Sequence, residues 1–311
     1  SPDPSCHLDE ATVLEALREV LQDPAIPKVG HNLKYDLLVL RNAGVRLAGH
    51  APDADRPLAG DTMIASYVLD ASRSSHSMDA LAMALLNRTN ISIKDLIGTG
   101  RHQRCFDEVP LDQACAYAAE DADVTLQLDH ALTGQLAAVP SLERLYRTVE
   151  MPLVDVLAEL EYNGVRVDPA ELDRQRERLQ ARIDDLAKAI DDAALEAIDR
   201  TFDHNSPRQL GEALFNKPDH PDRPGLGLKP IKKTKTGYST DAEVLEKLAH
   251  DDTIETPIPR LILEYRQLAK LVNTYLAALK DEIHPVTGRI HASFNQTVAV
   301  TGRLSAPCPP L

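Results

Sequence analysis

The chain has 311 residues, a formal net charge of −14, 43% hydrophobic residues and no Trp. This length allows one large domain or two ordinary ones, and the charge excludes a generally basic coat, although a local basic groove can still contact phosphates. No CxxC pair, signal peptide or bilayer-spanning apolar run is present, so we expect free thiols and a cytoplasmic protein. The four thiols are those of Cys6, Cys105, Cys115 and Cys308.

Residues 1–140 mix helical patterns with short extended ones. A short extended stretch at 26–29 runs into a helix that opens at 30–32 and stops at Gly44, and a strand-turn-helix unit of this kind predicts an α/β domain. Further helices are predicted at 9–21, 61–69 (capped by Asp61), 77–86 (capped by Ser77) and 111–132.

After residue 140 strand signals vanish and helices lengthen, so we place a domain boundary there and expect a mainly helical region over 141–311. Apolar residues behind the capping box at 168–171 follow a coiled-coil-like spacing, and a second capping box is predicted at 240–243. Other expected features are helices at 142–162, from 206 and at 262–279, a Pro/Gly/Lys-rich loop at 218–237, and a hairpin at 284–291.

Two short constellations in the first region place polar groups one helical turn apart. They pair Asn32 with Asp36, and Tyr117 with Asp121. Taken alone, each is compatible with a solvated helix surface, with Asn32 as a cap. The alternative is a site for a divalent metal, because Mg²⁺ prefers carboxylate oxygens and two such ions can drive phosphodiester hydrolysis.

The stretches GHNLKYD at 30–36 and YAAEDADVT at 117–125 resemble the second and third exonuclease motifs of the family A DNA polymerases. The resemblance implies a ribonuclease H-like 3′-5′ exonuclease domain using Mg²⁺ or Mn²⁺. It implies that Asp36 and Asp121 are metal carboxylates, that Tyr117 positions the attacking water, and that Asn32 lies in the same cleft. The family's first motif, Asp-x-Glu on an early strand, has no counterpart before Asn32. We therefore expect weak metal binding and little nuclease activity from this chain alone.

An ordered series in the second half resembles the thumb and the beginning of the palm of the same family. The series comprises 206–210, 228–234, 239–245, 262–271, 284–296 and 301–305. The resemblance implies contacts to DNA from Lys232, Lys233, Lys270, Asn273, Thr274, Gln296 and Arg303. The alternatives without a role in DNA binding are a solvated Lys-rich loop and an Arg303 held in a surface salt bridge. Val272 stands where the family often has Lys, which would remove one cation from the grip.

The resemblance ends at Ser305, and 306–311 do not match. We expect a fragment without the polymerase carboxylates, unable to synthesise DNA. Its expected partners are primer–template duplex and a single-stranded 3′ end, with deoxynucleotides only for a full-length parent, which we expect to be monomeric and nucleoid-associated. A stand-alone ribonuclease D-like exonuclease and a non-catalytic DNA-binding module remain alternatives.

Overall fold

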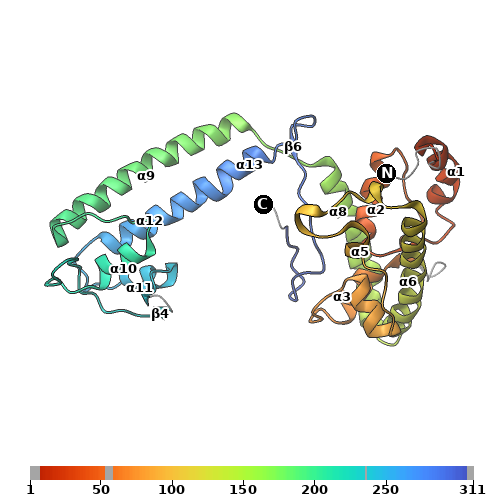
Figure 1. Ribbon diagram of the computed structural model, residues 1–311, viewed down its shortest axis with the longest axis horizontal. Helices are drawn as coiled ribbons and strands as arrows, with labels where there is room; N and C mark the ends of the chain where they lie inside the picture. The colour runs from red at the N-terminus through yellow and green to blue at the C-terminus, as the bar shows by residue number, and fades with distance from the viewer. Residues whose placement is uncertain (1–7, 53–58, 235–236, 307–311) are drawn as a thin grey trace. The chain divides into compact units, whose positions relative to one another are not determined.

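The computed structural model describes residues 8–52, 59–234 and 237–306, except for the side chain of His102 (Figure 1). These residues form two compact units. Unit 1 holds the described residues up to Val165 together with the segment from His291 onward, and unit 2 holds Arg166–Ile290. The compact units therefore divide at a different place from residue 140, and the last described segment returns to unit 1.

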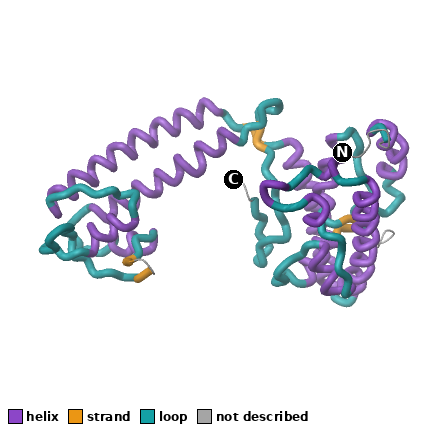
Figure 2. Tube along the Cα trace, viewed as in Figure 1, coloured by secondary structure: helices purple, strands orange, loops and turns teal. Residues whose placement is uncertain are grey.

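Unit 1 is mostly helical (Figures 1 and 2). Its helices are α1 (Glu10–Gln22), α2 (Leu33–Asn42), α3 (Thr62–Leu69), α4 (Met78–Leu81), α5 (Ile93–Ile97), α6 (Leu111–Ala137), α7 (Pro140–Leu145) and α8 (Met151–Asn163). Two 3₁₀ turns, η3 (Gly100–His102) and η4 (Phe106–Glu108), and two π-helical stretches, η2 (Ala82–Leu86) and η5 (Tyr146–Glu150), complete them. The strand β3 (Val165–Arg166) lies where unit 1 passes into unit 2.

The strands of unit 1 are short. β1 (Val29–Gly30) pairs in parallel with β2 (Gly60–Asp61), with Val29 opposite Gly60. An apolar cluster holds α3, α4 and α6 together, with Ile64, Leu81 and Leu128 almost completely buried. The α/β prediction is confirmed in a helix-rich form, in which a small parallel pair fixes where α2 and α3 begin.

Helix starts in unit 1 follow from local side-chain caps. The carboxylate of Asp61 accepts hydrogen bonds from the backbone N–H groups of Met63 and Ile64, as expected for the cap of α3. The Ser77 hydroxyl accepts from the N–H of Ala80 and caps α4. Both predicted caps are confirmed, because each depends only on residues two or three positions apart.

Unit 2 is built around a long antiparallel helix pair. Its elements are α9 (Pro169–Ile198), α10 (Pro207–Phe215), β4 (Lys233–Thr234), β5 (Gly237–Tyr238), α11 (Ala242–Ala249), α12 (Ile258–Lys270), the π-helical η6 (Leu271–Leu276), α13 (Ala277–Asp281) and β6 (Arg289–Ile290). The run from α12 to α13 lies beside α9, and α10 and α11 pack at one end of the pair (Figure 1).

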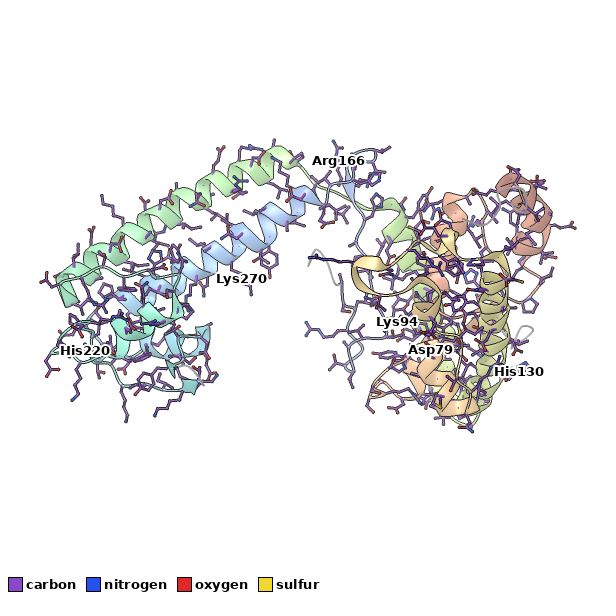
Figure 3. All side chains as sticks on the ribbon, viewed as in Figure 1. Asp79, Lys94, His130, Arg166, His220 and Lys270 are labelled. Carbon is purple, nitrogen blue, oxygen red and sulfur yellow. The ribbon has the colours of Figure 1, made fainter. Side chains whose placement is uncertain are left out.

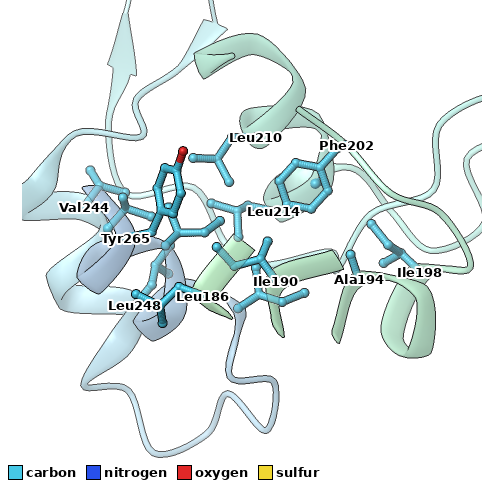
Figure 4. Packing of buried hydrophobic residues seen from close by; sticks show 14 of the residues in the cluster. Leu186, Ile190, Ala194, Ile198, Phe202, Leu210, Leu214, Val244, Leu248 and Tyr265 are labelled. Atoms are coloured by element: carbon cyan, nitrogen blue, oxygen red, sulfur yellow. The ribbon is translucent and has the colours of Figure 1, made fainter. Parts of the chain in front are cut away.

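The core of unit 2 lies where α10, α11 and α12 meet α9 (Figure 4). Ile183, Leu186 and Ile190 of α9 are buried, as the coiled-coil-like spacing predicted, and the same face continues through Ala194 and Ile198. Burying such side chains contributes about 1.5–3 kcal/mol each, so this seam is a main source of stability for the unit.

Three local expectations in unit 2 need correction. The cap of α11 is Asp241, which accepts from the N–H of Val244, and Thr240 lies before it. Helix α12 begins at Ile258 and not at the expected residue 262, because Pro259 fits the first turn of a helix. At 284–291 the turn forms through hydrogen bonds from the N–H of His284 to the carbonyl of Arg289 and from the N–H of Gly288 to the carbonyl of His284, but only Arg289–Ile290 is strand.

The two cysteines that the structure describes, Cys105 and Cys115, are free, as predicted, and both are exposed. Cys6 and Cys308 lie outside the described residues. None of the described helices is long and apolar enough to cross a membrane.

Candidate functional site

A cavity of about 650 Å³ in unit 1 lies between β1, α2 and α6. Asp36 of α2 and Asp121 of α6 both line it, together with Gly30, His31 and Thr125. The structure therefore brings two carboxylates that are 85 positions apart in sequence to one hollow. The chemical roles of these carboxylates stay predictions.

Asp61 fixes the helix that carries Asp36. Besides capping α3, its fully buried carboxylate accepts from the N–H groups of Asn32 and Leu33, at 3.1 and 2.7 Å. One side chain therefore caps the first turns of two helices. The backbone N–H of Asp61 donates a hydrogen bond to the Tyr146 hydroxyl, at 2.9 Å. The sequence predicted the first cap and missed the second, because residues 29 positions apart give no local signal.

The environment of Asp36 disfavours its negative charge. Burial, followed by the nearby charge of Asp61, raises the pKa of Asp36 from its ordinary 3.8 to about 6. The like charges of Asp36 and Asp61 repel each other, although Asp36 itself is exposed to water, and a cation bound between protein oxygens relieves such repulsion. The site therefore favours a cation or a proton at Asp36.

Asp121 and Tyr117 interact along one face of α6. Burial raises the pKa of Asp121, and a hydrogen bond from the Tyr117 hydroxyl opposes the rise. Burial and the Asp121 charge raise the pKa of Tyr117 to about 12, so the phenol keeps its proton at neutral pH. The Phe106 ring, 5.9 Å from the Tyr117 ring between centroids, packs beside it. A protonated phenol next to a carboxylate is a suitable hydrogen-bonding partner for a water molecule.

The residues of the GHNLKYD stretch take different roles. Asn32 has a left-handed backbone, with φ of 66° and ψ of 47°, and its side chain makes no cap hydrogen bond. This conformation is uncommon outside glycine, but Asn adopts it more readily than most residues, and Asn87 and Asp199 adopt it as well. Lys34 points elsewhere: its buried ammonium group pairs with Glu161 and donates to the carbonyl of Phe294.

The side chains of the cavity supply only part of the ligands that a divalent cation needs. Two carboxylates are the hard oxygen ligands that Mg²⁺ prefers, and Mg²⁺ is often held by one or two of them plus waters. Within 8–52, 59–234 and 237–306, however, no three His, Cys, Asp or Glu side chains are grouped to hold an ion directly. Asp36 and Asp121 therefore fit an ion that keeps much of its water.

The predicted DNA contacts of unit 2 lie on exposed positions. Lys232 forms an ion pair with Asp241, and Lys233 lies 5.8 Å from the centre of the Tyr238 ring. Lys270, labelled in Figure 3, ends α12, and it is exposed, as are Asn273 and Thr274 in the π-helical stretch that follows. Their roles stay predictions.

Val272, which stands where the family often has Lys, is buried. Its side chain is 4% exposed and belongs to the apolar core of unit 2. The expectation that Val272 removes a cation from a DNA-facing surface is wrong in this structure, since the position faces the core.

The segment after Ile290 is held within unit 1 by hydrogen bonds. The Gln296 amide is 7% exposed and donates to the carbonyl and to the carboxylate of Glu150, each at 3.0 Å. A minor-groove contact by Gln296 would require release of these bonds, and this role stays a prediction. Arg303 is exposed, and no salt bridge to it is found among the described residues.

Sequence comparisons identify two families along the chain. The family described as 3′-5′ exonuclease matches residues 2–137, and DNA polymerase family A matches residues 169–311. DNA polymerase I of Pseudomonas aeruginosa is 43% identical over 305 residues, which cover 98% of this chain and 31% of that protein. DNA polymerase I of Rhizobium leguminosarum is 40% identical over 299 residues, 96% of this chain and 27% of that protein.

A solved structure gives the same picture. The POL domain of Pol1 from M. smegmatis, in complex with DNA primer-template and dNTP, superposes with a TM-score of 0.73 at 30% identity. The match covers 99% of this chain and 46% of that chain. The chain thus spans less than a third of the curated relatives' length and less than half of the solved neighbour.

Proposed function

Because the chain belongs to DNA polymerase family A and carries that family's 3′-5′ exonuclease sequence in residues 2–137, we propose that it supplies proofreading and duplex-holding parts of a DNA polymerase I. In the whole protein these parts would serve template-directed DNA synthesis in replication and repair. A stand-alone ribonuclease D-like exonuclease is disfavoured, since residues 169–311 match the polymerase family.

One observation carries the nuclease part of the proposal: Asp36 and Asp121 line the same cavity beside Tyr117. In the proposed reaction both carboxylates hold Mg²⁺ or Mn²⁺. Such an ion, when bound, lowers the pKa of a water and stabilises the leaving oxygen of a phosphodiester. The Tyr117 phenol, protonated at neutral pH, orients the attacking water, and Asn32 lies at the start of the helix that carries Asp36.

The proposed DNA grip uses unit 2 and the last described segment. Lys270, Asn273 and Thr274 lie within one helical turn of each other on exposed positions and would contact backbone phosphates. Such contacts give affinity without reading sequence. Arg303, exposed and without a salt bridge among the described residues, would reach acceptors that all base pairs share in the minor groove.

Fluorescence anisotropy tests the grip on the 311-residue chain. We expect it to bind a primer–template with a recessed 3′ end more tightly than single-stranded DNA or RNA, with log affinity falling linearly with log salt concentration. Equal affinity for RNA and for recessed duplex would contradict the assignment.

A nuclease assay on a 3′-labelled single strand tests the cavity. With only two carboxylates in its lining, we expect this chain to degrade DNA very slowly in Mg²⁺ or Mn²⁺. Whatever rate remains should disappear in Asp121→Asn and persist in Asp112→Asn, an exposed residue on the same helix. Residual activity that survives Asp121→Asn would show that this cavity is not the nuclease site.

A further inference from the structure

His31 lies on the wall of the Asp36–Asp121 cavity, and its contact with Thr62 bears on which ring nitrogen carries the hydrogen. Its Nδ1 is 2.8 Å from the hydroxyl oxygen of Thr62. That hydroxyl donates its single proton to the carbonyl oxygen of Gly30, at 3.2 Å. With that proton directed to Gly30, the Thr62 oxygen accepts from His31, and we assign the ring hydrogen to Nδ1.

The second ring nitrogen of His31 is consequently an acceptor. Burial lowers the pKa of His31, against the opposing charges of Asp61 and Asp79, so the ring is neutral at neutral pH and Nε2 has a free lone pair. Among the described residues Nε2 has no hydrogen-bond partner, and it is not one of the enclosed polar atoms that lack one. Because His31 lines the cavity and its Nδ1 is directed to Thr62, we place Nε2 at the cavity wall.

The polar groups of the cavity wall are nearly all acceptors. They are the carboxylates of Asp36 and Asp121 and Nε2 of His31, while the hydroxyl of Thr125 is directed to the sulfur of Met78, 3.9 Å away. A hydrated cation fits, because Mg²⁺ and Mn²⁺ held by few carboxylates retain waters whose polarised O–H groups donate strongly.

We propose that His31 accepts, through Nε2, a hydrogen bond from a water in the hydration shell of the divalent ion held by Asp36 and Asp121. His31 is thus a positioning residue that contacts the ion through water, in agreement with the lack of a three-ligand cluster within the described parts of the chain. This inference rests on the metal site of the proposed function. It adds a third side chain, with Thr62 and Gly30 behind it, to the two carboxylates.

Two amide variants separate the two ring nitrogens of His31. The amide of His31→Asn reaches the place of Nδ1, so it preserves the donor to Thr62 but removes the acceptor at Nε2. The longer amide of His31→Gln reaches the place of Nε2 and restores an acceptor there. Mn²⁺ binding to the 311-residue chain, measured by electron paramagnetic resonance, reads the ion directly and does not depend on nuclease activity.

We expect His31→Asn to bind Mn²⁺ about ten-fold more weakly at the site that Asp121→Asn abolishes, as the loss of one hydrogen bond to a charged group implies. His31→Gln should stay within about three-fold of the parent chain, on the same principle. Thermal unfolding followed by circular dichroism checks that both variants are folded as the parent is.

Two results overturn the inference in distinguishable ways. Unchanged Mn²⁺ binding in His31→Asn, or equal losses in both variants, would remove His31 and leave the Asp36–Asp121 site standing. The absence of any Mn²⁺ binding that depends on Asp121 in the parent chain would remove the proposed metal site and the His31 contact together.

Discussion

Asp129 offers the sharpest test of the energetics of unit 1. This residue of α6 is 3% exposed, and its Oδ2 is buried without a hydrogen-bond partner. Burial raises its pKa from 3.8 to about 6, with the Thr133 hydroxyl opposing the rise. Each pKa unit corresponds to about 1.4 kcal/mol, so an ionised Asp129 costs the folded state about 3 kcal/mol at pH 8.

The sign of the pH dependence follows from the direction of this shift. Between pH 3.8 and about 6 the folded state holds a proton that the unfolded state has lost, so the stability of unit 1 falls as the pH rises through this window. Asp129→Asn cannot ionise. We therefore expect it to stabilise unit 1 by about 3 kcal/mol at pH 8 and by less than about 1 kcal/mol at pH 4.

Urea unfolding followed by circular dichroism, with hydrogen exchange read on α6 peptides, measures both values. Asp112→Asn, an exposed change in the first turn of the same helix, serves as the matched control and should change stability by under about 1 kcal/mol at either pH. A stabilisation by Asp129→Asn that is equal at pH 4 and pH 8, or absent at both, would refute the reasoning.

Three further predictions concern contacts of each unit. Lys34→Met should destabilise unit 1 by about 3–5 kcal/mol in urea unfolding, because it leaves the buried Glu161 without an opposite charge. The double variant with Glu161→Leu should recover most of this loss, and failure to recover it would rule out the unpaired charge as the cause. Asp61→Ala should cost about 2–4 kcal/mol in the same assay, since it uncaps α2 and α3 together, and a loss near 1 kcal/mol would mean that one cap suffices. Lys270→Ala should lower the slope of log affinity for primer–template against log salt by about one, with Lys188→Ala, an exposed lysine of α9, as the matched control, and an unchanged slope would exclude a phosphate contact.

Features that depend on neighbours in sequence were predictable. The caps at Asp61, Ser77 and Asp168 accept hydrogen bonds from N–H groups two or three positions away. A polar residue followed by apolar residues at helical spacing was therefore sufficient to predict these helix starts. The buried face of α9 followed from its spacing for the same reason. The predicted cap of α11 was one residue too early, because Thr240 and Asp241 are both good caps and the backbone conformation decides which of them precedes the first helical residue.

Features that depend on distant residues were not predictable. Lys34 and Glu161 are 127 positions apart, and the partners Gln296 and Glu150 are 146 apart. No local pattern distinguishes such groups from exposed charges. Gln296 shows the consequence: its residue type suits a minor groove, but in the fold a carbonyl and a carboxylate already occupy its amide.

Asp61 connects the folding of unit 1 to the chemistry proposed for it. Four backbone N–H groups from two helices converge on its buried carboxylate, and these hydrogen bonds oppose the rise that burial causes in the pKa of Asp61. The charge of Asp61 is the second cause of the raised pKa of Asp36, so the arrangement that places Asp36 in the cavity also makes its ionisation unfavourable. Neutralising Asp61 would relieve Asp36 only by releasing the helix that carries it. The divalent cation proposed at Asp36 and Asp121 would remove this repulsion without disturbing either cap, because it would neutralise charge in the cavity and leave the four N–H groups bound to Asp61.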